Sequence, residues 1–450
     1  MKQRKTALLL AAALTLSLVG AAALAAEDPA PLAASRTVPA AEEIQPEARE
    51  TAVLADAQPE APESSETPEE PQIPDEDYIP DPVGTVTFAN LSRRMHENNL
   101  QILAIQESIT NLELLDYDYI LDDMRETIAN LSRAQWMMVM MGQQGTLAYE
   151  QLDQANQAVW DQFESIKDGD MQKDNADMIR QLKNLQDQIV MAGEATYIAL
   201  AAMEIQEGGL ERQLSALDRQ LEELELRHQL GHISSMTLRE AQGGRTALTS
   251  GLSTLRMNLD TYKGQLELLM GADITGQIKL GVLPAVTQKD LNTMDLEKDL
   301  ETAKENSWQL YSAQLDLKDA KQDFADRGGE LASDYRPKDP QYMQVRYGYY
   351  AARHTYNNTV QNFELGLRNL YLKVQDCKQI LDASKTALAV AQDSRSAAQL
   401  KYSQGSLSKN ALLEAEDKVS EAQEKVDSAS NDLFSAYNTY RWAVDYGILN

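Results

Sequence analysis

The sequence contains little cysteine, little positive charge and, outside one segment, little proline. One cysteine in 450 residues, Cys377, excludes an intramolecular disulfide framework and a zinc site made of cysteines. The 41 Lys and Arg residues stand against 70 Asp and Glu residues, and the net charge of −29 argues against nucleic acid and anionic membrane surfaces as partners. After the N-terminal segment, no stretch is apolar enough for a transmembrane helix.

Recognisable catalytic motifs are also lacking. The sequence has no Gly-rich phosphate loop, no nucleophile elbow and no HExxH. His228 and His232 are close in sequence, but Gly231 between them is expected to end the helix and separate them. The many carboxylates fall on the polar faces of amphipathic helices, where solvation is the usual state. We therefore expect no enzyme activity, no cofactor and no metal site.

After residue 83, proline occurs at Pro284, Pro337 and Pro340 alone. Because an internal proline breaks a helix, so long a stretch with three prolines and few β-rich runs predicts an all-α protein with little or no β-structure.

The N-terminus has two parts that precede this helical region. Residues 1–25 form an export signal: a basic start, an apolar run and small residues at Ala23-Leu24-Ala25, with cleavage favoured over an uncleaved anchor. Residues 26–84 contain eleven of the fourteen prolines and sixteen acidic residues against Arg36 and Arg49. Such a segment cannot bury enough apolar surface to order itself, so it predicts a disordered acidic linker.

The most informative feature is a passage that occurs twice. The chain reads RHQLGHISSMTLREA around Gly231 and KYSQGSLSKNALLEA around Gly405. Glycine can adopt the left-handed conformation that ends a helix, and a serine at the third position after it can cap the next one. Each passage therefore predicts a turn between two helices. The residues that coincide without a gap are Gly231/Gly405, Ser234/Ser408, Leu238/Leu412, Glu240/Glu414 and Ala241/Ala415.

Apolar residues on both sides of each turn recur at steps of three and four, as in the contact line of a coiled coil. The first copy interrupts the pattern at Arg245. The expected contact residues before and after the first turn are Leu210, Leu214, Leu217, Leu221, Leu224, then Leu238, Ala241, Leu248, Leu252, Leu255, Leu259, Tyr262, Leu266 and Leu269. Those of the second turn are smaller: Ala387, Ala391, Ala398, then Leu412, Ala415, Val419, Ala422, Val426, Ala429, Leu433, Ala436, Tyr440 and Ala443.

The opening helix of each copy is duplicated as well. MHENNLQILAIQ at Met95 is echoed by AKENSWQLYSAQ, with Glu97/Glu305, Asn98/Asn306, Gln101/Gln309 and Gln106/Gln314 in common. We therefore divide the folded region into a first helical repeat (85–272), a connector (273–302) and a second helical repeat (303–450).

Two segments interrupt the helical pattern of the first repeat. The run QWMMVMMGQQG (135–145) is Met-rich; core packing is the favoured interpretation, and an adaptable apolar contact surface is the alternative. SIKDGDMQKDNAD (165–177) predicts a charged break, followed by a long helix from about Met178. In the second repeat, RGGELASDYRPKDPQ (327–341) predicts a break before a helix of about sixty residues that ends at Gly405.

Together these features resemble the TolC family of outer-membrane efflux proteins. That family has two tandem repeats with "A-x-x-N-x-x-L" opening helices, "Y-x-x-G-x-x-S-x-x-x-L-x-x-A" turns and helices that end in "L-x-x-L-x-G", matched here by QLELLMG and YRWAVDYG. The resemblance spans about residues 85–447. It implies a helical cylinder of three identical chains in the cell envelope, at the outer membrane, that works with a periplasmic membrane-fusion adaptor and an inner-membrane pump.

By position, the resemblance also implies site residues. The two turns would form the tips that dock the adaptor, and acidic residues near the second turn would narrow the conduit. That acidic pattern is half kept, because Ala411 and Thr237 occupy the first place of each pair. The adaptor-docking residues are Gly231, Ile233, Ser234, Leu238, Gly405, Leu407, Ser408 and Leu412, and the possible constriction residues are Glu240 and Glu414.

One departure from the family concerns its membrane strands, two in each repeat. A membrane strand needs about 9–11 alternating residues. Within 327–350, QYMQVRYGYY alternates weakly and predicts one strand at most, and neither candidate segment of the first repeat alternates. The membrane strands are therefore expected to be missing, and membrane association stays open. This leaves two hypotheses: a TolC-like component of an export or efflux system, or a coiled-coil scaffold of the envelope that transports nothing.

Overall fold

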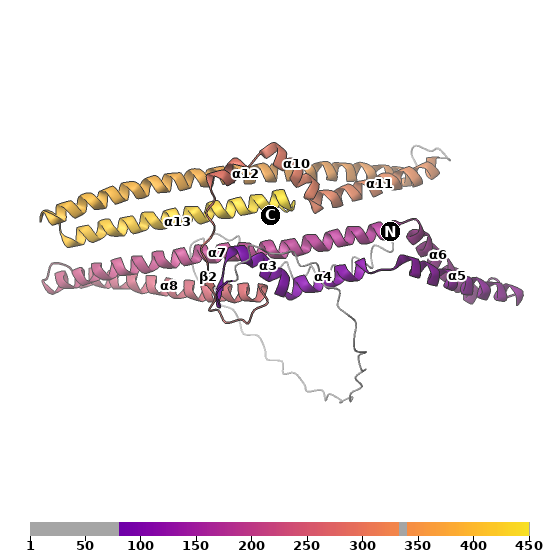
Figure 1. Ribbon diagram of the computed structural model, residues 1–450, viewed down its shortest axis with the longest axis horizontal. Coiled ribbons are helices and arrows are strands. Elements are labelled where there is room, and N and C mark those ends of the chain that lie inside the picture. Colours follow the sequence, from indigo (N-terminus) through magenta and orange to yellow (C-terminus); the bar gives the residue numbers. More distant parts are fainter. Residues whose placement is uncertain (1–80, 333–339, 450) are drawn as a thin grey trace, which may run out of the picture. The chain divides into compact units, whose positions relative to one another are not determined.

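The computed structural model describes residues 81–332 and 340–449, and nearly all of them are helical (Figure 1). The expectation of an all-α fold is confirmed. The strands found in these ranges are two very short segments, β1 (Thr85–Val86) and β2 (Lys279–Leu280), which pair in parallel. None of the helices described in these ranges combines the length and apolarity that crossing a membrane requires. The predicted export signal and nearly all of the acidic linker lie outside the described residues.

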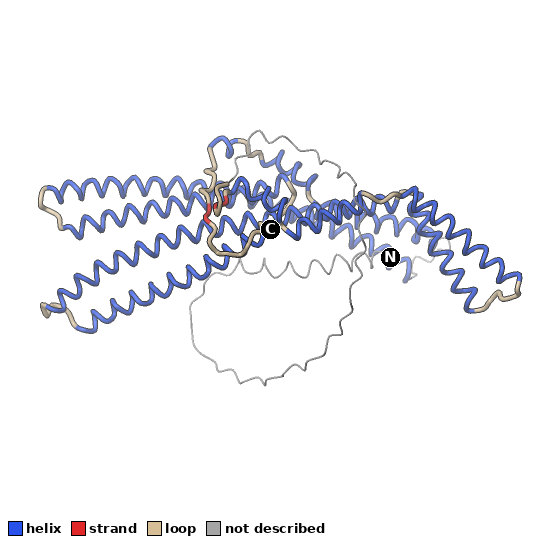
Figure 2. Tube along the Cα trace, turned by 60° about the horizontal axis from the view of Figure 1, so that its bottom comes forward, coloured by secondary structure: helices blue, strands red, loops and turns tan. Residues whose placement is uncertain are grey.

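The helices follow one another as two similar series. Figure 2 shows two long helical hairpins whose turns lie on the same side. The first series is α3 (Phe88–Asn98), α4 (Leu100–Glu113), α5 (Tyr117–Met140), α6 (Leu147–Lys167), α7 (Asp170–Gln229) and α8 (Ser235–Leu269). The second is α9 (Gln288–Asn292), α10 (Leu296–Asn306), α11 (Trp308–Ala332), α12 (Pro340–Ser403) and α13 (Lys409–Asp445).

Each series contains one long antiparallel hairpin, α7–α8 and α12–α13. At 60 and 64 residues, α7 and α12 are each about 90 Å long or slightly more. The expected contact line of α8 is confirmed by the burial of Leu252, Leu255, Leu259 and Leu266. That of α13 is confirmed by the burial of Leu412, Ala422, Ala429, Leu433, Ala436, Tyr440 and Ala443.

The contact line of α12 differs from the expectation at one position. Ala387 is exposed, whereas Leu388, Ala391 and Ala398 are partly buried. The line continues the fully packed positions Val374, Cys377 and Leu381, and steps of three and four from Leu381 lead to Leu388 rather than to Ala387.

The two hairpins have the same register. Asp218 and Arg245, whose side chains pair at 2.6 Å, lie almost symmetrically before and after Gly231 in the sequence. Arg395 and Glu416, which pair at 3.3 Å, lie in the same near-symmetric way about Gly405. Both hairpins therefore fold about the same point, just after the glycine, and the arginine beside each contact line reaches a carboxylate on the opposite helix.

The two opening helices make similar contacts with the ends of the hairpins, but not through the duplicated letters, because Asn99 corresponds to Ser307. Asn99 caps α4 and donates from Nδ2 to the Leu269 carbonyl at the end of α8, at 2.6 Å. Asn306 donates to the Asp445 carbonyl at the end of α13, at 2.9 Å. Gly271 and Gly447 end these helices with φ of 63° and 66°, and a Cβ at either would collide with the backbone of the opening helix. Each opening helix thus holds the end of its hairpin.

The connector after α8 is fixed to the first series. β2 pairs with β1, and the hydroxyl of Tyr197 on α7 lies 3.0 Å from the Val86 carbonyl and 2.8 Å from the Gly281 carbonyl. Burial raises the pKa of Tyr197 to about 12, so this hydroxyl keeps its proton and donates at neutral pH.

The predicted break within 165–177 is present but much shorter than expected. The charged segment 165–177 is helical except at Asp168 and Gly169, and α7 begins at Asp170 rather than near Met178. Charged residues suit the exposed face of a helix, so composition alone did not locate the turn; Gly169, with φ of 81°, makes it. Conversely, the opening helix expected through MHENNLQILAIQ is broken at Asn99.

Where they are described, the segments considered as possible strands form helices and turns and no strand. α5 extends through the Met-rich run to Met140, and α12 includes QYMQVRYGYY from its first turn. Residues 333–339 lie outside the described residues. The preference for core packing of the Met-rich run is wrong, because Met137, Met140 and Met141 are exposed.

Candidate functional site

The two hairpin turns have matching backbone geometry. Gly231 has φ of 74° and Gly405 has φ of 72°, values that glycine adopts without strain. In the first turn the amide of Gly231 donates to the His228 carbonyl at 2.9 Å, and in the second that of Gly405 donates to the Tyr402 carbonyl at 2.9 Å. The helix ends are therefore closed in the same way.

Each turn is followed by the predicted serine cap. Ser234 Oγ accepts from the Thr237 amide at 3.2 Å, and Ser408 Oγ accepts from the Ala411 amide at 3.2 Å. Such a cap satisfies one of the amides that a helix N-terminus leaves free. The two glycines and two serines are all exposed, whereas Ile233, Leu238 and Leu407 are partly buried and Leu412 is buried.

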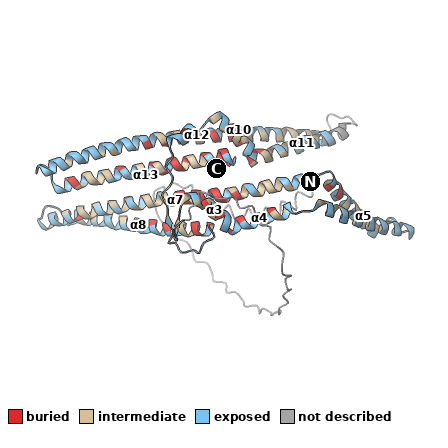
Figure 3. Ribbon diagram, viewed as in Figure 1, coloured by how far each residue is buried: buried red, intermediate tan, exposed pale blue. Residues whose placement is uncertain are grey.

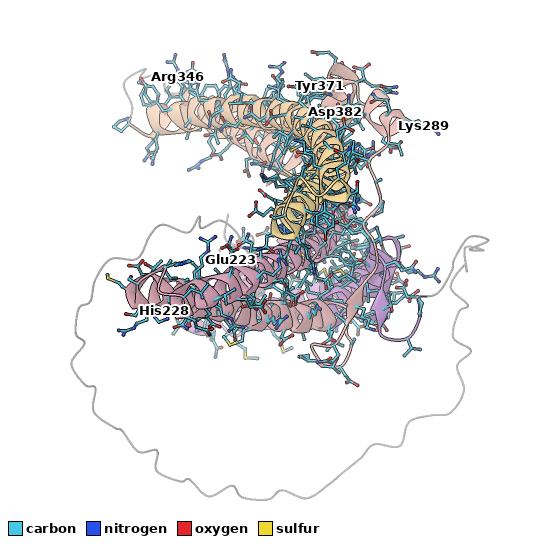
Figure 4. The ribbon with its side chains drawn as sticks, turned by 90° about the vertical axis from the view of Figure 1, so that its left-hand side faces the viewer. Glu223, His228, Lys289, Arg346, Tyr371 and Asp382 are labelled. Carbon is cyan, nitrogen blue, oxygen red and sulfur yellow. The ribbon has the colours of Figure 1, made fainter. Side chains whose placement is uncertain are left out.

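Apolar side chains that the sequence reasoning missed surround the turns. Leu226 and Leu400 occupy equivalent positions in the two copies, and both are more than half exposed. The three–four pattern of contact residues does not reveal these positions, because they lie outside the contact line. Figure 4 looks along the hairpins from the side of the turns, with His228 labelled near the end of α7. The exposed apolar residues near the turns are Leu226, Leu230, Met236, Leu400 and Tyr402.

The histidine pair is separated as expected. α7 ends at Gln229, and the left-handed Gly231 lies between His228 and His232, which are not on one helix. Within the described residues, no group of three or more His, Cys, Asp or Glu side chains is placed to hold a metal ion.

The structure brings the two hairpins together through α7 and α13. Arg212 and Arg219 on α7 pair with Glu424 and Asp417 on α13. A step of seven along α7 thus matches a step of seven back along α13, which is the spacing of an antiparallel coiled coil. Near the turns, Asn410 donates to the carboxylate of Glu223 at 3.0 Å (Glu223 is labelled in Figure 4). These contacts hold the end of α7 beside the start of α13.

The same register continues at the other end of α13. Glu194 accepts hydrogen bonds from Trp442 Nε1 at 2.6 Å and from Asn438 Nδ2 at 2.8 Å. Glu194 is buried, and this burial raises its pKa while the two hydrogen bonds act in the opposite direction. Further toward the N-terminus of α7, burial raises the pKa of Asp187 to about 6. The contact between α7 and α13 therefore contains carboxyl groups whose ionised form is disfavoured by burial.

Gly209 makes close contact between the hairpins possible. Gly208 and Gly209 are adjacent in α7, and the helix is continuous through them. A Cβ at Gly209 would overlap the carboxylate of Glu424, whereas one at Gly208 would meet open space. Gly209 thus leaves room for Glu424 to reach Arg212. No helical spacing in the sequence distinguishes these two glycines.

The two candidate constriction residues are not brought together. Both Glu240 and Glu414 are exposed. Glu414 lines a groove between α7 and α13 together with Arg212, Asp417 and Lys418, whereas Glu240 lies on α8 outside it. The groove mixes both signs of charge, so within one chain it does not form an acidic gate.

Comparisons with known proteins give structural matches alone. No protein-family model matches the sequence, and no curated protein matches it either. Among 22 matching chains of solved structures, the outer membrane protein VceC of Vibrio cholerae is 15% identical, with a TM-score of 0.41 over 60% of this chain and 74% of its own. A membrane protein of Pseudomonas aeruginosa is 11% identical, with a TM-score of 0.48 over 80% and 91%. The Campylobacter jejuni CmeC outer membrane channel is 13% identical, with a TM-score of 0.42 over 65% and 68%. At these values the likeness concerns the fold alone.

Proposed function

We propose that this protein is a TolC-like component of an export or efflux system of the cell envelope. In this proposal, copies of the chain assemble into a helical conduit, and the two hairpin turns dock a membrane-fusion adaptor that belongs to an inner-membrane pump. The observation that carries the proposal is the duplication of the turn. Two turns with the same backbone geometry and register, far apart in the sequence, are held side by side by the contact between α7 and α13.

The duplication also suggests how copies assemble. Within one chain, the first helix of one hairpin (α7) contacts the second helix of the other (α13). Because the hairpins are equivalent, α12 of one copy and α8 of a neighbour can make the reverse contact in the same register. Such a head-to-tail contact forms a ring when its rotation closes. Three copies per ring is the number that the family resemblance implies.

The faces that this contact would cover carry exposed apolar residues. On α8, Met257 and Leu268 are exposed, although the equivalent Asn431 and Trp442 of α13 are buried. On α12, Leu365 and Leu372 are exposed, although the equivalent Met191 and Ile198 of α7 are buried. Exposed apolar positions whose duplicates are covered favour a face that a second copy covers.

Cysteine cross-linking tests the ring. Thr386 and Ser250 are the equivalents of Arg212 and Glu424, so Thr386→Cys with Ser250→Cys, in a Cys377→Ala background, should form disulfides between copies and give a closed trimer. Thr386→Cys with Met257→Cys, one heptad out of register, is the matched control. A cross-linked trimer for the first pair alone is expected; equal cross-linking of both pairs, or none, contradicts the assembly.

A charge at a tip tests adaptor docking. Leu407→Glu places a carboxylate in the second turn, and Gly405→Pro removes the left-handed glycine that shapes it. Either should abolish export that depends on the adaptor encoded near this chain's gene, and co-purification with that adaptor. Gln392→Glu, an exposed position on α12 away from the turn, should leave both unchanged. Normal export with folded, expressed Leu407→Glu would contradict the proposal.

The alternative, an envelope scaffold without transport, is favoured by the helical structure of the segments where membrane strands were sought. It predicts that the gene has no neighbouring adaptor and pump, and that Glu414→Gln changes nothing measurable. Under the conduit proposal, Glu414 supplies three carboxylates around one axis, and their removal should lower the preference of the conduit for cations in a conductance measurement.

A further inference from the structure

The α5–α6 hairpin is the part of the chain that the proposed function does not use. The two helices pack on each other, with Gln135 donating to Asp153 at 2.9 Å and Asn156 donating to Gln135 at 2.7 Å. At its base, Asn175 of α7 donates to the Tyr117 hydroxyl at 2.7 Å. Because α6 joins the N-terminal end of α7, this base and the Gly231 turn lie at opposite ends of a helix about 90 Å long.

At the end of α5, from Trp136 to Met141, every exposed side chain is apolar, and the turn beyond it presents the uncharged but polar Gln143 and Gln144. Successive residues of an α-helix point about 100° apart, so a run of apolar residues covers the whole circumference. Figure 3 shows α5 largely exposed. The exposed fractions at the tip are 63% for Trp136, 53% for Met137, 36% for Val139, 68% for Met140, 64% for Met141 and 71% for Leu147.

The tip also carries no charge. Residues 134–149 contain no Asp, Glu, Lys or Arg, although 25% of the chain is charged. The hydrogen bond between Gln135 and Asp153 fixes the register and places Glu150 level with Met138. From this level to the end of the hairpin there are about six residues, or about 9 Å of helix.

Several backbone amides of the turn are bonded within the hairpin. Gly142 and Gly145 have φ of 71° and 82°. The amides of Met141, Gly142 and Gln143 donate to the carbonyls of Met137, Val139 and Met138 at 2.9–3.0 Å, and the Gln143 carbonyl accepts from Thr146. Each amide that is already bonded lowers the cost of moving the turn out of water.

We propose that this tip inserts into the interfacial layer of a lipid bilayer. A partner helix would select an apolar stripe along one face, whereas a helix end whose exposed side chains are all apolar, as from Trp136 to Met141, suits a medium that is apolar on every side. The uncharged depth of about 9 Å matches interfacial insertion, which reaches about 5–10 Å, and falls far short of a membrane span. Trp136 suits the boundary between lipid chains and headgroups. The net charge of −29 selects electrically neutral lipid.

A site-specific label tests the insertion in the full chain. The native Cys377 is replaced by alanine, and Met140→Cys carries an environment-sensitive fluorophore. Tyr119→Cys is the control, because it lies on the same helix near the base and is 71% exposed. With phosphatidylcholine vesicles, the label at 140 should shift to the blue and be quenched by lipids with brominated chains, and the label at 119 should not change. This reads the position of the tip whether or not the N-terminal segment also binds the vesicles.

Charge substitutions complete the test, with the label at Met141→Cys. Trp136→Glu with Met140→Glu should reduce lipid quenching at least tenfold, whereas Leu114→Glu with Tyr119→Glu, which adds the same charge near the base, should not. Vesicles enriched in phosphatidylglycerol should quench less than phosphatidylcholine alone. Equal quenching at 119 and 140, no quenching at either, or a blue shift that requires an added envelope protein instead of lipid would overturn the proposal. None of these outcomes depends on whether the turns at Gly231 and Gly405 dock an adaptor.

Discussion

The two long hairpins have turns of the same geometry, but the side chains of their contact lines differ in size. At equivalent positions, Leu255 of α8 corresponds to Ala429 of α13, and Leu248 to Ala422. Despite this change in side-chain volume, the ion pairs beside each contact line show the same register. The turn and its cap therefore set the register, while the side chains of the contact line determine how much apolar surface each hairpin buries.

The charged edges of the hairpins differ as well. In the first hairpin, Arg256 pairs with Glu207 at 2.6 Å and Lys263 pairs with Glu204 at 3.2 Å. The second hairpin has Ser430 and Leu381 at the places of Arg256 and Glu207. Since exposed pairs contribute about 0–1 kcal/mol each, the leucines and not these charges should decide the difference in stability.

The largest expected effect comes from making the first hairpin like the second. Leu255→Ala removes a buried side chain and leaves a cavity between α7 and α8, which should lower the free energy of unfolding by about 2–5 kcal/mol. Denaturant unfolding followed by circular dichroism measures it. Met257→Ala, an exposed position on the same helix, is the control and should cost far less. If Leu255→Ala lowered the free energy of unfolding no more than the control, the leucine contact between α7 and α8 would not be what stabilises the hairpin.

The reverse substitution should be destabilising for the opposite reason. Ala429→Leu adds volume to a contact that is already tightly packed, since Ala429 is buried between α13 and α12. Overpacking of this kind costs about 1–3 kcal/mol. The same unfolding measurement applies, with Ala429→Ser as a variant of nearly unchanged volume. Stabilisation by Ala429→Leu would show that the second hairpin contains unfilled space.

Much of the fold follows from local patterns, whereas contacts between distant helices do not. The turns at Gly231 and Gly405 and the α8 contact line through Leu259 were predicted residue by residue, because the spacing of residues along the sequence determines them directly. The α5–α6 hairpin was missed since its Met-rich end has no polar face to give a period. The pair Arg212–Glu424 joins helices that are far apart in the sequence, and no spacing along either helix announces it.

The two adjacent glycines of α7 distinguish the stability of one hairpin from that of the contact between the hairpins, because Gly209 faces Glu424 of α13 and Gly208 does not. Gly208→Ala meets open space and should stabilise the protein by about 1 kcal/mol, as alanine does in a helix interior. Gly209→Ala should lose this gain, since its Cβ displaces the Glu424 carboxylate from Arg212. Thermal unfolding of the two variants side by side measures the difference. Equal gains would mean that α13 does not lie against Gly209 in solution.

The smallest expected effect concerns pH and the N-terminal part of α7, where the duplicate position on α12 is Gln361 and cannot titrate. Burial raises the pKa of Asp187 from 3.8 to about 6. Between these values the folded state holds a proton that the unfolded state releases, so stability falls as pH rises from about 4 to 6 and stays lower above. Asp187→Asn should therefore be more stable than the native protein at pH 8, by on the order of 1 kcal/mol or less because solvent reaches the site, and equal to it at pH 4. Melting temperatures at the two pH values measure this difference. Because Glu194 lies in the same contact and also has a pKa raised by burial, the variant should keep part of the pH dependence. A variant whose advantage is the same at both pH values would show that the effect is packing and not the proton.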